Sequence, residues 1–214
     1  MDPNLFLLLV TIVNLVSAVL TLVVWVTAYR ASRFLGSVKM LFLSVSFLLF
    51  SLGLFSQTFY SAAALVEGVV LSRLFVGEGY LLYSTLMLAG YMILAFAYTI
   101  GEVGAAALSA ITLTPRPVNN VARLFFNFRV LFEYGIQLLS AALLIYVLVK
   151  VYEEYFSKKA SYSAPIAVGL TLLFIQLLVR VFDLDSAFNF LFASIIQLVG
   201  FSLIFYAVWK VNSK

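Results

Sequence analysis

The chain has 214 residues, of which 64% are hydrophobic and 10% are charged, and its mean hydropathy is +1.13. A soluble domain has about 45–50% apolar and about 25% charged residues, so this composition excludes a water-soluble fold. Cysteine and histidine are both absent, which excludes disulfides, thiolate nucleophiles, histidine-ligated metals and histidine proton relays. We therefore expect an all-α integral membrane protein without redox or metal chemistry and without a cofactor.

Uncharged apolar runs predict six membrane spans. The runs cover residues 3–29, 40–66, 79–101, 134–149, 160–179 and 186–209. Most approach or exceed the roughly 20 residues that a spanning helix needs, and apolar residues before Glu133 lengthen the fourth. The first run is expected to be a retained span, because it is longer than a signal-peptide core and no basic leader precedes it. The prediction is one transmembrane helical domain, residues 1–214, in the cell membrane.

Two further segments are weaker candidates for a seventh crossing. Residues 103–114 are short, and residues 60–76 contain Glu67 and Arg73, so neither offers about 20 predominantly apolar residues. With six alternating spans the basic residues divide six against six, and the positive-inside rule then assigns no orientation. A crossing at residues 103–114 would divide them eight against four.

A faint internal similarity predicts a three-plus-three repeat, with halves at residues 1–101 and 130–214. Residues 13–20 align with residues 136–143, and the third run shares a Leu, Gly, aromatic and Ala pattern with the sixth. Residues 102–129 form the expected interfacial linker, which also contains the possible extra crossing. Contiguous three-span halves would be inverted, whereas a crossing linker would make them parallel, as in sugar transporters built from three-helix repeats.

Polar residues inside the spans follow single helix faces, which are expected to point toward other helices because lipid offers no hydrogen bonds. Ser37, Ser44, Ser51 and Thr58 recur every seven residues, which favours tight helix packing. Four amides have two interpretations. They either hold neighbouring helices together or line a polar groove that binds a small solute. These groove candidates are Asn14, Gln137, Gln176 and Gln197.

Ionisable residues in or near the spans are a second group of candidates, because a charge at mid-helix costs about 2.5–3.5 kcal/mol. They are Glu133, Arg180, Asp183 and Asp185. Arg180 is expected to extend to the headgroups or to pair with Asp183. The run Asp183-Leu184-Asp185 resembles the Asp-x-Asp pattern that holds Mg²⁺ and phosphate in lipid transferases, although no second acidic motif accompanies it.

Aromatic residues near the run ends, including Tyr80 and Tyr83, are expected to mark the membrane interfaces. The basic residues form no continuous stripe, so nucleic acid is not an expected partner. The small number of amides and the lack of cysteine and histidine are typical of a hot environment.

Three functions stay open. The first is movement of a small solute, or relay of a signal, through the polar groove. The second is a non-catalytic anchor or assembly subunit, whose partners are membrane lipids and a membrane-embedded protein or a second copy of the chain. The third is a lipid-modifying enzyme that uses the acidic pair. A non-enzymatic function is favoured.

Overall fold

The computed structural model describes residues 3–67, 78–100, 125–158, 163–182 and 187–212. These ranges contain six helices and no strand. The helices are α1 (Pro3–Leu35), α2 (Val38–Glu67), α4 (Glu78–Ile100), α5 (Phe125–Lys158), α6 (Ser163–Phe182) and α7 (Ala187–Asn212). All six are long and apolar enough to cross a membrane, which confirms the predicted fold class: the chain is a multi-pass helical membrane protein.

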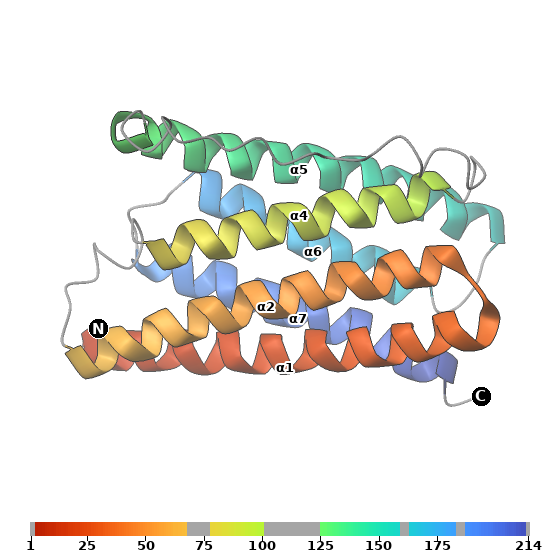
Figure 1. Cartoon of the computed structure of the whole chain (residues 1–214), viewed down its shortest axis with the longest axis horizontal. Coiled ribbons are helices and arrows are strands. Elements are labelled where there is room, and N and C mark those ends of the chain that lie inside the picture. Colours follow the sequence, from red (N-terminus) through yellow and green to blue (C-terminus); the bar gives the residue numbers. More distant parts are fainter. Residues whose placement is uncertain (1–2, 68–77, 101–124, 159–162, 183–186, 213–214) are drawn as a thin grey trace, which may run out of the picture.

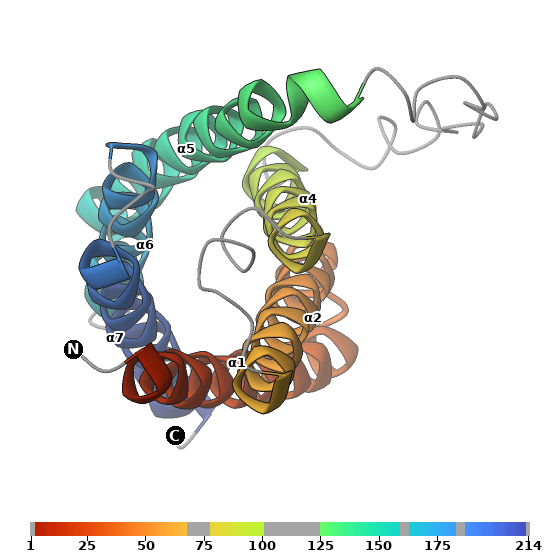
Figure 2. The ribbon, with the colours of Figure 1, turned by 90° about the vertical axis from the view of Figure 1, so that its left-hand side faces the viewer.

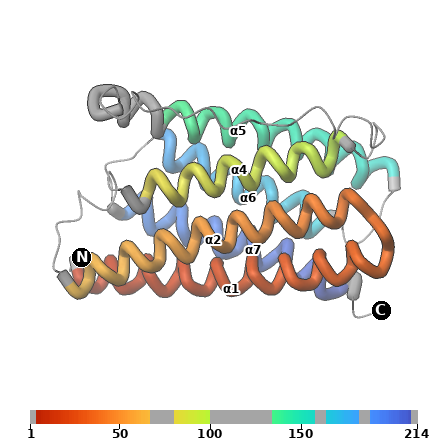
Figure 3. The backbone as a smooth tube through the Cα atoms, in the orientation of Figure 1, coloured from red at the N-terminus to blue at the C-terminus, as the bar shows by residue number. Residues whose placement is uncertain are grey.

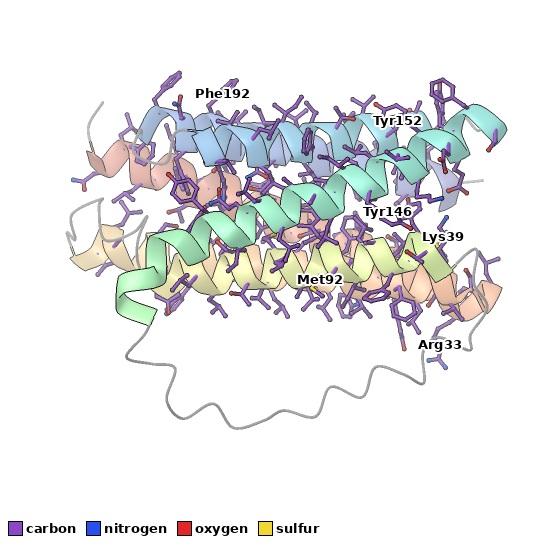
Figure 4. All side chains as sticks on the ribbon, turned by 90° about the horizontal axis from the view of Figure 1, so that it is seen from above. Arg33, Lys39, Met92, Tyr146, Tyr152 and Phe192 are labelled. Atoms are coloured by element: carbon purple, nitrogen blue, oxygen red, sulfur yellow. The ribbon has the colours of Figure 1, made fainter. Side chains whose placement is uncertain are left out.

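The six helices form a ring (Figure 2). Each packs mainly against its two neighbours in the order α1, α2, α4, α5, α6 and α7, and α7 closes the ring against α1. The outer surface is apolar. Met92 and Phe192, for example, are 43% and 48% exposed and point away from the bundle (Figure 4). Lipid covers such a surface, so the polar faces turn inward.

A tight turn joins the first two helices. Gly36 has a φ of 61°, a left-handed conformation that suits glycine and ends α1 six residues beyond its apolar run. The Met40 amide donates to the Ser37 hydroxyl at 3.4 Å and so caps α2. Deeper in the hairpin the Ser51 hydroxyl donates to the Ala18 carbonyl at 3.0 Å, which supports the structural interpretation of the heptad serines.

Helices α4 and α5 run in the same direction (Figures 1 and 3). Tyr80, near the start of α4, accepts a hydrogen bond from Gln137, and Thr99, near the end of α4, is 2.9 Å from the Tyr146 hydroxyl further along α5. Contacts that advance together along both helices define a parallel pair. The end of α4 and the start of α5 therefore lie at opposite ends of the bundle.

This parallel pair corrects the alternating topology on which the six-against-six division of basic residues was based. The helix directions instead repeat between the halves, with α1, α4, α5 and α7 pointing one way and α2 and α6 the other (Figure 1). Residues 60–67 belong to α2 and form no separate span. Residues 103–114, the candidate for an extra crossing, lie outside the described residues.

The helix directions also separate the charges. We call the end at which α1, α4, α5 and α7 finish the basic end. It carries Arg30, Arg33, Lys39, Lys150, Lys158 and Lys210. Figure 4 shows Arg33 and Lys39 together there. In the described helices, the opposite end carries only Arg129 and Arg180. From the positive-inside rule we expect the basic end to face the cytoplasm.

We predict that single cysteines will report this orientation, since the chain has none of its own. Phe34 at the basic end and Val66 at the opposite end are 89% and 88% exposed, so Phe34→Cys and Val66→Cys form a matched pair. A membrane-impermeant maleimide applied to intact cells should label the cysteine at position 66 and leave position 34 unlabelled until the cells are opened. The reverse pattern would contradict the orientation.

Aromatic side chains fill the centre of the ring. Phe50 of α2 lies 4.9 Å from Tyr91 of α4 and 5.9 Å from Phe201 of α7, between ring centroids, and all three are fully buried. We call these three residues the aromatic plug. Helices α2 and α7 are not neighbours in the ring, so the contact between Phe50 and Phe201 crosses its interior and closes it.

Two glycines set the closest helix contact. A Cβ atom at Gly169 of α6 would lie 2.7 Å from the Gly200 carbonyl oxygen, and one at Gly200 of α7 would lie 2.9 Å from the Gly169 carbonyl oxygen. Backbone atoms cannot move aside as a flexible side chain can. The two backbones therefore approach as closely as they do because both positions lack a Cβ.

We predict that Gly169→Ala lowers the free energy of unfolding by about 1–3 kcal/mol, because the added methyl group forces α6 and α7 apart. Thermal or denaturant unfolding in detergent micelles measures this change. Gly135→Ala is the matched control, since a Cβ there has no neighbour within 4 Å and alanine favours the helix. Equal stabilities of the two variants would argue against the close contact.

Candidate solute-binding site

Arg180, in the last turn of α6, is buried inside the bundle with 3% of its surface exposed. Its Nη2 donates to Gln197 Oε1 of α7 at 3.2 Å. Its Cζ lies 5.0 Å from the ring centroid of Tyr83 and 4.8 Å from that of Phe190, within the range of cation–π attraction. The expectation that Arg180 extends to the headgroups is therefore wrong: the guanidinium is directed at neighbouring helices.

The guanidinium keeps two buried donors, Nε and Nη1, without a hydrogen-bond partner. An arginine side chain stays protonated in proteins, so it cannot reduce the cost of burial by losing its charge. A buried charge without full pairing costs several kcal/mol. Such a group is expected only where packing holds it in place or where a ligand completes it.

No described carboxylate neutralises Arg180. The acidic side chains that the structure describes are those of Glu153 and Glu154, in the last turns of α5 at the basic end. Glu153 Oε2 lies 3.3 Å from Lys150 Nζ, and Glu154 Oε2 lies 3.0 Å from Lys39 Nζ. Both carboxylates are thus paired far along α5 from the Arg180 end. Among the described side chains, Arg180 is a buried cation without a counter-ion.

The other predicted ionisable residues fall where the structure gives no side-chain description. Asp183 and Asp185 lie outside the described residues. Glu133 belongs to α5, but its side chain is likewise not described. The expected pair of Arg180 with Asp183 and the acidic metal motif therefore stay predictions.

A small cavity lies against Arg180, between α4, α5 and α6. Its volume is about 10 Å³, close to the room that one water molecule needs. Six residues of polar type and three apolar ones line it, but the surface that they present to the cavity is mainly apolar. The polar lining residues are Tyr80, Tyr83, Ser84, Gln137, Ser140 and Arg180, and the apolar ones are Met87, Ile136 and Leu177.

Two tyrosines of α4 connect the amides to this cavity. The Tyr83 hydroxyl donates to Gln197 Oε1 at 3.3 Å, so this oxygen accepts hydrogen bonds from both Tyr83 and Arg180. The Gln137 Nε2 donates to the Tyr80 hydroxyl at 2.5 Å. The other amide atom of each glutamine, Gln197 Nε2 and Gln137 Oε1, is buried without a hydrogen-bond partner.

The structure brings only part of the predicted groove together. Gln137 lines the cavity, and Gln197 bonds to two residues that line it. Gln176 lies one turn before Arg180 on α6, fully buried with both amide atoms unpaired. Asn14 of α1 is also buried and unpaired but does not line the cavity. Among these four residues, no two amides bond to each other in the described hydrogen bonds.

The sequence interpretation missed the roles of Tyr80 and Tyr83, which it assigned to the membrane interface. Both are buried and line the cavity. Tyr91 was also missed: its side chain is fully buried, and its hydroxyl has no hydrogen-bond partner. The available signal was helical spacing, since Tyr80, Ser84, Met87 and Tyr91 lie three or four residues apart on one face of α4.

Comparison with known proteins gives this site no precedent: no protein family, no curated protein and no solved structure matches the chain.

We predict opposite stability changes at two fully buried glutamines. Gln197→Leu removes the acceptor that Arg180 and Tyr83 share and should cost about 2–3 kcal/mol, since hydrogen bonds to charged groups are among the stronger ones. Gln176→Leu removes an amide with no partner and should be neutral or should stabilise by about 1 kcal/mol. Unfolding in detergent compares them. Equal losses would show that Gln176 is paired in the native protein.

Proposed function

We propose that the protein binds a small polar solute inside its helical bundle and moves it across the membrane. The observation that carries this proposal is the buried Arg180, which keeps two unpaired donors and lines a small cavity. Polar groups that only hold helices together are normally satisfied by one another. A set of buried, unpaired polar atoms around a cavity is what a binding site presents before its ligand arrives.

The position of the cavity supports transport over a permanently open pore. Arg180 lies near one end of the bundle, and the aromatic plug separates it from the basic end. Helix α4 carries both Tyr83, which lines the cavity, and Tyr91, whose ring is part of the plug. We propose that a solute that pairs with Arg180 acts on the plug through this helix.

The three-plus-three repeat is part of the proposal, because transporters commonly combine two similar halves around one site. Its support is the repeated helix directions together with matching burial at aligned positions. The buried pairs include Asn14 and Gln137, Ser17 and Ser140, Phe50 and Leu173, Tyr91 and Phe201, and Ala97 and Ala207. Applying the offset that aligns residue 13 with residue 136 to α2 and α6 makes Gln57 correspond to Arg180, and both are buried.

Flux into proteoliposomes tests the proposed function. Vesicles containing the purified protein are mixed with urea, glycerol, glycine, sodium acetate or sodium chloride, and swelling is followed by light scattering. At least one probe should enter faster than into protein-free vesicles. Gln137→Leu and Gln197→Leu should lower the protein-dependent rate about tenfold, the effect of losing one hydrogen bond of about 1.4 kcal/mol.

Gln57→Leu is the matched control, since it removes a buried amide that does not line the cavity and should keep the flux. A probe that stabilises the protein against unfolding but never crosses the vesicle membrane would favour relay of a signal over transport. If no probe binds or crosses, the proposal is wrong.

A further inference from the structure

We infer that the solute recognised beside Arg180 is a small monovalent anion of about the size of a water molecule, such as chloride. This inference rests on the proposed function, because it names the class of solute for the same cavity.

Charge is the first argument. Arg180 contributes a full positive charge, and the described carboxylates are paired with Lys39 and Lys150 at the other end of α5. A cation at this cavity would be repelled, and a neutral solute would leave the guanidinium uncompensated in a medium of low dielectric constant. One negative charge neutralises the guanidinium. A divalent anion would leave a net negative charge buried in place of the positive one.

Hydrogen bonding is the second argument. Arg180 Nε, Arg180 Nη1 and Gln197 Nε2 are buried donors without partners, against one unpaired acceptor on a lining residue, Gln137 Oε1. The excess of donors needs an acceptor. A halide accepts several hydrogen bonds at once and donates none, so it satisfies such a set better than a solute that brings donors of its own.

Shape is the third argument. The rings of Tyr83 and Phe190 lie near the guanidinium at cation–π distances, while its Nε and Nη1 have no hydrogen-bond partner. The side chains of Met87, Ile136 and Leu177 bound the cavity and hold it to about 10 Å³. A monatomic anion needs little more room than one water molecule, whereas a larger organic anion would have to displace these walls.

Thermal unfolding of the purified protein in a non-ionic detergent tests the inference. The salts are sodium chloride, bromide and nitrate at constant ionic strength, with sodium gluconate as the bulky reference and formamide as the neutral probe. Chloride should raise Tm in a saturable manner by about 2–4 °C over gluconate, as expected for a ligand that binds only the folded protein. Gluconate and formamide should not.

Three variants assign the effect to the guanidinium. Arg180→Gln should lose the response to chloride, yet in gluconate it should unfold at no lower temperature than the parent, because it removes a buried charge without a counter-ion. Arg180→Lys should keep a weaker response, since it retains the charge without the planar donors. Gln57→Leu should respond as the parent does, because it leaves the cavity intact.

Four outcomes would overturn the inference. A response to formamide without one to the anions would assign a neutral solute and leave the proposed function standing. No response to any probe, together with no flux, would remove both. Equal stabilisation of the parent and Arg180→Gln would be a general salt effect. A response to chloride that appears only in Asp183→Asn would make Asp183 the counter-ion of Arg180.

Discussion

Every polar group inside the ring has to find its partner within the protein, because the surrounding hydrocarbon offers none. The hydroxyl residues meet this constraint locally. Ser46 donates to the Phe42 carbonyl, Thr58 to the Leu54 carbonyl and Ser84 to the Tyr80 carbonyl, all one turn back on the same helix. Carboxamides and a guanidinium carry more donors than one backbone carbonyl accepts, so they depend on other helices. Apart from the Tyr91 hydroxyl, the unpaired buried side-chain atoms of the described residues therefore belong to the amides and Arg180.

Helix α4 joins the cavity to the aromatic plug. Helix α4 contributes Tyr80 and Tyr83 to the cavity lining and Tyr91 to the plug, so a single rigid helix carries both features. Gly90 lies beside the Phe50 ring, where any Cβ would collide with it. Helix α4 and the Phe50 ring are therefore in close contact because position 90 lacks a Cβ.

The sequence was enough to predict the spans, since length and hydropathy decide them, and to predict that the heptad serines pack α2 against α1. It was not enough to predict that α4 and α5 are parallel. Hydropathy does not show in which direction a helix crosses the membrane, so consecutive spans were assumed to alternate in direction. Periodicity placed Gln137 and Gln176 on inward helix faces. It did not predict how deeply these side chains are buried or which residues bond to them. Tyr80 was assigned to the membrane interface because it lies near the end of an apolar run. The sequence alone did not predict which helices cover it.

The proposed duplication makes the position of the charge informative. Two halves that run in the same direction and bury aligned positions would form two similar sites if their side chains were alike. In the proposed alignment the side chains differ, because Gln57 corresponds to Arg180 and Met87 corresponds to Gln197. An amide and a thioether require no counter-ion, whereas a guanidinium does. The proposed duplication would therefore leave one charged site among the described residues, and that site lies between α4, α5 and α6. A ligand bound there contacts both halves at once, which is the arrangement that allows binding to change how the halves meet.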